Sequence, residues 1–226
     1  QVRGMNVAIR NANDAISLSQ TAEGALSKIN DMGQRMRELA VQSANATNNE
    51  TDRASLDAEF QALSAEIKRN LEGTSFNGTK LFAALATMTF QVGANNTATD
   101  QIAVVTTNLT ADTTMTGILG GGGGATAADI KNVDKSREAL DKLDSMLATV
   151  NSKRAEFGAT QNRFEAVIQT LQVSAENQTA ARSRIMDADF ASETAALTRA
   201  QVLQQAGTAM LSQANSLPNN VLSLLR

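Results

Sequence analysis

The fold is decided by residues 140–171, which read LDKLDSMLATVNSKRAEFGATQNRFEAVIQTL. Large side chains recur there every seven residues in two parallel rows, a pattern typical of a long helix that packs along a narrow stripe. If the helix extends to about residue 181, it is roughly 80 Å long at about 1.5 Å per residue, so it must pack lengthwise against other helices. We expect the bundle seam to contain Leu140, Leu147, Phe157, Phe164, Ile168 and Leu171.

Two polar residues, Arg154 and Gln161, interrupt this seam. Polar residues at such positions commonly specify the register of neighbouring helices, and we favour that interpretation over a binding role. Upstream, Thr126 and Asp129 have the spacing of a capping box and predict the start of the helix.

Two further helices are predicted in the N-terminal third of the chain. Residues 5–40 have heptad-like spacing, and the run 43–49 ends this helix because its short polar side chains compete for backbone hydrogen bonds. Residues 56–71 carry an apolar face, and Gly73 is the expected C-terminal stop. We expect these two helices to form an antiparallel pair.

The middle of the chain has a different pattern. Residues 87–92 and 101–106 are rich in threonine and β-branched side chains and flank a turn-forming segment, which predicts a β-hairpin. The sequence Phe76-Asn77-Gly78 predicts another turn. The glycine run 120–124 lacks the Gly-Lys-Ser/Thr that would follow in a phosphate-binding loop, so we interpret it as a flexible linker.

The last segment keeps the heptad spacing but uses small residues, among them Ala196, Ala200 and Gly207. Such a helix buries little apolar area and is marginal by itself, so we expect it to become ordered on association. The sequence therefore predicts a mainly α fold. It is an elongated antiparallel bundle of long helices with a small β-hairpin region, plus a C-terminal assembly helix.

Composition excludes several classes of function. The 226 residues contain no His and no Cys, which removes histidine-based nucleophile pairs, thiolate or imidazole metal sites and disulfides. The carboxylate pairs Asp187/Asp189 and Asp141/Asp144 lack partners that would complete an acid–base or metal site. We therefore predict no enzyme, no cofactor and no metal. The dispersed charge, −3 overall, predicts no nucleic-acid partner, and no apolar run is long enough to predict a membrane span.

Several long strings closely resemble bacterial flagellins. They are residues 34–45 (QRMRELAVQSAN), 75–81 (SFNGTKL), 90–94 (FQVGA), 183–190, 199–207 (RAQVLQQAG) and 221–226 (VLSLLR).

The resemblance covers nearly the whole chain and implies a structural subunit of the flagellar filament, which assembles with other copies of itself for motility. It also implies that residues 1–181 form an outer-core helical rod, with the β-hairpin region at about 83–125. Residues 182–226 would be the C-terminal half of an inner coiled-coil domain. The family's N-terminal inner segment has no counterpart here, so we do not expect the chain to polymerise unaided.

The same resemblance implies two further partners. A Toll-like innate immune receptor would recognise Arg35, Leu39 and Glu59. Because Arg35 and Leu39 are one helical turn apart, we expect Arg35→Ala or Leu39→Asp to weaken signalling without loss of helicity. A flagellin export chaperone would bind the last helix. The apolar residues expected there for chaperone binding and inner-core packing are Phe190, Leu203, Met210, Leu217 and Leu224.

The implied location is extracellular, in the flagellum, after a cytoplasmic chaperone-bound stage and export by the flagellar type III apparatus. The helical pattern also fits a protein of another functional class. A helical adaptor or translocator-like module could use the amphipathic tail on a heterologous target, and helical periodicity alone does not separate it from a filament subunit. The flagellin-like strings favour the filament subunit.

Overall fold

The computed structural model describes residues 1–120, 127–186 and 190–224, with side chains as far as residue 214. The chain divides into two compact units, Gln1–Glu176 and Asn177–Arg226. The predicted boundary between residues 181 and 182 lies five residues after this division and remains a prediction.

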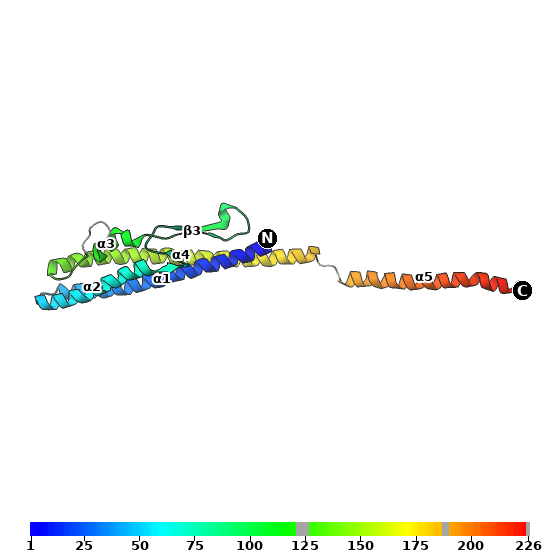
Figure 1. Ribbon diagram of the computed structural model, residues 1–226, viewed down its shortest axis with the longest axis horizontal. Coiled ribbons are helices and arrows are strands. Elements are labelled where there is room, and N and C mark those ends of the chain that lie inside the picture. The colour runs from blue at the N-terminus through cyan, green and yellow to red at the C-terminus, as the bar shows by residue number, and fades with distance from the viewer. Residues whose placement is uncertain (121–126, 187–189, 225–226) are drawn as a thin grey trace. The chain divides into compact units, whose positions relative to one another are not determined.

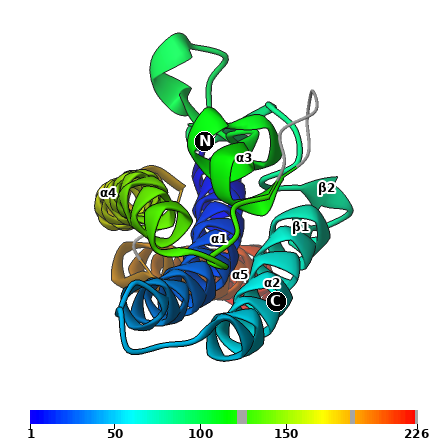
Figure 2. The same ribbon diagram turned by 90° about the vertical axis from the view of Figure 1, so that its left-hand side faces the viewer.

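Two antiparallel helices form the N-terminal part of the first unit (Figures 1 and 2). Helix α1 (Val2–Ser43) and helix α2 (Glu50–Gly73) have the predicted extents. Asn49 and Asp52 form a capping box at the start of α2, with reciprocal bonds of 2.9 and 3.1 Å between side chains and main-chain N–H groups. The turn is closed by Arg53 of α2, whose Nε donates to the Ser43 carbonyl at 3.0 Å.

Helix α4 (Val133–Met186) is the predicted long helix, and its 54 residues span roughly 80 Å. Hydrogen bonds pair it antiparallel with α1. Asn30 Nδ2 donates to Asn151 Oδ1 at 2.7 Å, and the Arg37 Nε donates to Asp144 Oδ1 at the same distance. Gly33 lets the helices approach closely at this level, because a Cβ there would lie 2.8 Å from the Met146 side chain.

The two polar seam residues of α4 both contact Glu23 of α1. Gln161 Nε2 donates to Glu23 Oε2 at 3.1 Å, and Arg154 Nη2 lies 3.8 Å from Glu23 Oε1. These contacts support the register interpretation. They also have a cost, since Arg154 Nε is buried without a hydrogen-bond partner among the described residues.

The two predicted seam rows of α4 are buried to different degrees. Phe157 and Phe164 are buried, with Phe164 fully inaccessible to solvent. Leu171, which follows Phe164 in the same row, is only half-buried, as are Leu140, Leu147 and Ile168 of the other row. The buried face of α4 also includes Ala139 and Met146, which lie outside both heptad rows.

The predicted start of the long helix was wrong. Thr126 lies outside the described residues, and α4 begins at Val133, where Asn132 Oδ1 accepts the Lys135 N–H at 2.8 Å. Asp129 instead forms an ion pair with Lys135 Nζ at 2.5 Å. The physical reason is the burial of Ile130, whose side chain is inaccessible to solvent and holds this stretch in the core as non-helical chain.

The β region contains two small antiparallel hairpins. The first consists of β1 (Ser75–Phe76) and β2 (Thr79–Lys80), joined by the predicted turn with φ of 47° at Asn77 and 81° at Gly78. The second is the predicted hairpin of β3 (Thr87–Gln91) and β4 (Gln101–Val105). Among the described residues of the range 83–125, it is the one hairpin.

Three short helical segments complete the region: η1 (Ala98–Asp100), η2 (Leu109–Ala111) and α3 (Thr113–Leu119). The sequence analysis missed α3 because its threonines have low helix propensity. Burial of Met115 and Ile118 and a cap, in which Asp112 Oδ1 accepts the Thr114 N–H at 2.8 Å, stabilise it instead.

Two edge-to-face aromatic pairs attach the β region to α4. The ring centroids of Phe82 and Phe157 are 6.4 Å apart, and those of Phe90 and Phe164 are 5.8 Å apart. Such pairs contribute about 0.5–1.5 kcal/mol beyond the area that they bury. Four of the seven phenylalanines thus join the β region to the bundle.

The second unit contains α5 (Phe190–Leu224), the predicted C-terminal helix. Every described side chain of α5, from residue 190 to 214, is exposed. Within the described part of the chain, no helix combines the length and apolarity needed to cross a membrane.

We expect Phe164→Ala to lower the free energy of unfolding of the first unit by about 3–5 kcal/mol, because it opens a cavity and removes an aromatic pair. Phe190→Ala is the matched control, since the Phe190 side chain is 83% exposed, and should change stability by less than about 0.5 kcal/mol. Urea denaturation followed by circular dichroism measures both. Equal destabilisation by the two substitutions would contradict the assignment of the core.

Candidate functional site

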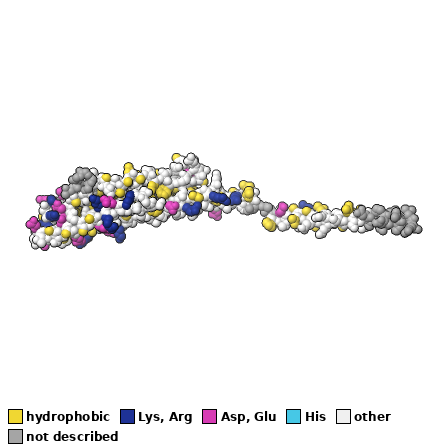
Figure 3. Space-filling view, viewed as in Figure 1, with side chains coloured by type: hydrophobic (Ala, Val, Ile, Leu, Met, Phe, Trp, Pro, Cys, Tyr) yellow, Lys and Arg dark blue, Asp and Glu magenta, His cyan; other side chains and the backbone are white. Residues whose placement is uncertain are grey.

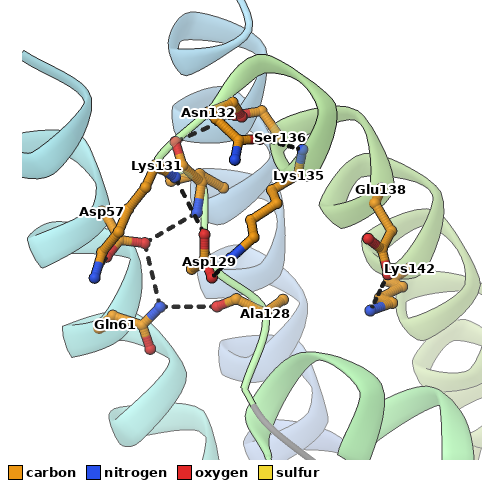
Figure 4. A network of polar contacts seen from close by, with 11 residues as sticks. Asp57, Gln61, Ala128, Asp129, Lys131, Asn132, Lys135, Ser136, Glu138 and Lys142 are labelled. Carbon is orange, nitrogen blue, oxygen red and sulfur yellow. Dashed lines mark hydrogen bonds and ion pairs between the residues drawn. The ribbon is translucent and has the colours of Figure 1, made fainter. Parts of the chain in front are cut away.

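A buried carboxylate, Asp57, organises one end of the bundle (Figure 4). It lies on α2 and is only 5% exposed. Its Oδ1 accepts the Ile130 main-chain N–H at 3.0 Å and Gln61 Nε2 at 3.3 Å, while Lys131 Nζ lies 3.8 Å from Oδ2. Gln61 also donates to the Ala128 carbonyl at 2.8 Å. These contacts hold the segment 127–132, which we call the strap, against α2.

The other side of the strap is held by two serines. Ser43 Oγ at the end of α1 donates to the Ile130 carbonyl at 2.5 Å, and Ser136 Oγ at the start of α4 lies 3.2 Å from the same oxygen. The main-chain groups of Ile130 are therefore satisfied from three helices. Because the network uses its polar groups internally, it has a structural role and offers no reactive group to a substrate.

This network was not predicted from the sequence. A signal was present, because Asp57 is spaced with Phe60, Ser64, Ile67 and Leu71 along the buried stripe of α2. A carboxylate on a buried stripe requires partners, since an unpaired buried charge is costly. The long-range partners were not readable, because the Ile130 N–H lies 73 residues from Asp57 along the chain and the Ala128 carbonyl lies 67 residues from Gln61.

Arg35 of α1 links the two N-terminal helices on the surface of the bundle. Its Nε donates to Glu59 Oε1 of α2 at 2.9 Å, and its Nη1 donates to Glu38 Oε2, also at 2.9 Å. The hydrogen bond that Arg35 donates to Glu59, followed by the one it donates to Glu38, holds the pKa of Arg35 above its ordinary value. About half of each of the Arg35 and Glu59 side chains is exposed, so both can reach a partner.

The predicted role of Leu39 needs correction. Its side chain is 1% exposed and belongs to the hydrophobic core. It therefore does not stand beside Arg35 as an accessible aliphatic contact. The physical reason is the breadth of the buried face of α1, which is wider than a single heptad stripe and includes Leu18 and Leu39 as well as Ala8 and Ala15.

Helix α5 presents apolar side chains at the predicted positions. Phe190, Leu203 and Met210 are all largely exposed, with Met210 at 72%. Leu217 and Leu224 belong to the same helix, but their side chains lie outside the described residues.

Of the two rejected carboxylate pairs, the structure describes only Asp141 and Asp144. Asp187 and Asp189 lie outside the described residues. Asp144 forms an ion pair with Arg37 at 2.7 Å, and Asp141 is exposed. In the described ranges, no three His, Cys, Asp or Glu side chains gather as a metal site would need. On the face drawn in Figure 3, basic and acidic side chains are interspersed over the first unit.

Comparison with known proteins identifies relatives of both ends of the chain. Residues 1–87 match the bacterial flagellin N-terminal helical region, and residues 140–225 match the bacterial flagellin C-terminal helical region. The first match covers α1, α2 and the first hairpin, and the second covers most of α4 and α5.

Whole proteins match as well. A flagellin of Halalkalibacterium halodurans is 44% identical over 227 residues, covering 100% of this chain and 80% of the relative. A flagellin of Bacillus subtilis is 40% identical over 254 residues, covering 100% and 82%. The crystal structure of Bacillus cereus flagellin superposes with a TM-score of 0.61 at 31% identity, covering 76% of this chain and 94% of that one.

Proposed function

This chain belongs to the bacterial flagellin family, and we propose that it assembles with copies of itself by lengthwise packing of its long helices to give a motility filament. Flagellins are structural proteins, and the chain is a component of the flagellar filament. Its long seams and the absence of His and Cys suit a subunit that performs no chemistry.

The observation that carries the assembly proposal is the exposure of α5. A helix of 35 residues gains only marginal stability from its own hydrogen bonds, and the described side chains of α5 have no core of their own. Burial of Leu203 and Met210 against neighbouring helices would contribute roughly 1.5–3 kcal/mol for each side chain. We infer that α5 supplies the inner packing surface of the filament.

The same surface is our proposed site for an export chaperone. Before assembly, exposed apolar side chains such as Phe190 and Leu203 would promote aggregation in the cytoplasm. A chaperone that covers α5 would prevent this and would be released at export through the flagellar type III apparatus. The extracellular filament is the destination of the exported chain.

A second proposal concerns the surface of α1 and α2. We propose that the Toll-like innate immune receptor recognises the exposed guanidinium of Arg35 together with Glu59. The Arg35–Glu59 ion pair presents both groups at one place, and arginine is enriched at binding hot spots. Leu39 contributes only indirectly in this proposal, by fixing the position of α1.

The adaptor alternative loses its support. It required that the flagellin-like strings be incidental, whereas flagellin relatives match the whole length of the chain.

The assembly proposal predicts that Leu203→Asp abolishes filaments. In the full-length gene product, expressed in a bacterium lacking its own flagellin, electron microscopy should show no filaments and swimming should be lost, because a carboxylate cannot be buried in the helix packing. Gln201→Glu, which places a charge on the same helix at a polar position, is the control and should assemble. Normal filaments from the Leu203→Asp variant would refute the role of α5.

If the receptor proposal is correct, substitutions of Arg35 and Leu39 should have different effects. Arg35→Ala should reduce receptor signalling by monomers about tenfold or more, while the free energy of unfolding changes by about 1 kcal/mol or less. Leu39→Ala should cost about 2–5 kcal/mol of stability. This replaces our expectation that Leu39→Asp leaves helicity intact. Reporter-cell assays and urea denaturation give the two readouts, and undiminished signalling by Arg35→Ala would disprove the site.

A further inference from the structure

The two strands of the second hairpin have different free edges. Two main-chain hydrogen bonds flank the hairpin ladder: Thr106 N–H donates to Ala86 O at 2.8 Å, and Val92 N–H donates to Asp100 O at 2.7 Å. They show that the even-numbered residues of the two strands form the hydrogen-bonded pairs. Because these pairs alternate along an antiparallel ladder, the odd-numbered residues point their N–H and C=O groups away from the partner strand.

The free edge of β3 is covered by α1. Asn11 Nδ2 donates to the carbonyl oxygen of Gln91, which is one of the outward-facing groups, at 3.0 Å. This edge is therefore closed to an additional strand. The opposite edge of the hairpin, formed by β4, faces away from α1.

The free edge of β4 is open. The outward-facing main-chain groups belong to Gln101, Ala103 and Val105, and the side chains of these three residues are exposed. No hydrogen bond from the described residues reaches these groups. The strand has no Lys, Glu or Pro of the kind that natural proteins place on edges to prevent pairing.

A groove of about 400 Å³ lies between the hairpin and α4, and Ile102 of β4 is one of its lining residues. Apolar side chains dominate its lining, among them Ile102, Val167 and Leu171. Arg163 of α4 also lines the groove, and its exposed guanidinium has no ion-pair partner among the described residues. The acidic residue of the hairpin, Asp100, accepts a hydrogen bond from Thr97 Oγ1 at 2.7 Å.

We propose that β4 and this groove bind an extended, acidic-apolar peptide segment of another protein by strand addition. The peptide backbone pairs with Gln101, Ala103 and Val105. Alternate peptide side chains enter the groove, since strand side chains alternate between faces. A carboxylate of the peptide pairs with Arg163. The open main-chain edge of β4 favours a partner in extended conformation, and the guanidinium of Arg163 favours a partner that carries a negative charge.

The first experiment is a titration of the ¹⁵N-labelled chain with a six-residue peptide that alternates valine and threonine and carries glutamate at one groove-facing position. We expect amide shifts and slowed hydrogen exchange at Gln101, Ala103 and Val105. The amides of Ile102 and Val104, which already bond to β3, serve as internal controls and should change little. Absence of binding, or equal responses from odd and even residues, would overturn the proposal.

Variants test the two recognition elements separately. Ala103→Pro removes one outward N–H and no bond to β3, and it should weaken peptide binding about tenfold. Arg163→Glu should weaken binding of the glutamate peptide by about three- to tenfold and strengthen binding of a lysine-substituted peptide. An N-methylated peptide, which lacks the donors that pair with β4, should fail to bind the unmodified chain, so the proposal is tested even if a variant does not fold.

A second copy of the chain is the competing occupant of the edge. Sedimentation of the chain without peptide distinguishes it. A concentration-dependent dimer with protected Gln101, Ala103 and Val105 amides would assign the edge to self-pairing and overturn the peptide proposal. A monomer that binds the peptide supports it.

Discussion

The antiparallel register of α1 and α4 is the constraint on which the rest of the structure depends. It is set by polar pairs inside and beside the seam, the Asn30–Asn151 hydrogen bond and the contacts of Glu23 with Arg154 and Gln161. A slip of α4 by one heptad would place a glycine or an aspartate where Asn151 stands, leaving Asn30 without this partner. An unsatisfied buried polar group costs about 1–3 kcal/mol, so these pairs select one register from several that leucine packing alone would allow.

Once α4 is in register, its aromatic side chains determine where the β region attaches. Phe157 packs against Phe82, and Phe164 packs against Phe90. The strap, which precedes α4, is held in place by the hydrogen bond between Asp57 and the Ile130 N–H. The β region has little core of its own, because its strands are short and each sheet has only two of them. Its position is therefore a consequence of the helical bundle, and so is the open edge of β4.

Local patterns were sufficient to predict the long helices, the second hairpin and the turn at Asn77, because heptad spacing and turn residues act over a few positions. The predicted cap at Thr126 and Asp129, however, misplaced the start of α4. The sequence did not reveal contacts between distant segments. Asp57 accepts a main-chain N–H 73 residues away, and Leu39 is buried because the core-facing side of α1 is wider than a single heptad stripe. Helix α3 was missed for the same reason, since tertiary burial of Met115 overrides the weak propensity of its threonines. Of the predicted surface residues, Arg35, Glu59 and Phe190 are accessible, as a partner would require.

We propose that the first unit is stable through its own register-locked core, whereas α5 becomes stable only on association with partners. Amide hydrogen exchange of the isolated chain, resolved by residue, distinguishes the two parts. We expect strong, cooperative protection of the buried residues of α1 and of α4 up to Ala175, and protection of α5 residues 190–214 that is lower by several orders of magnitude. Equal protection of α5 and the bundle, in the absence of any partner, would show that α5 is stable by itself.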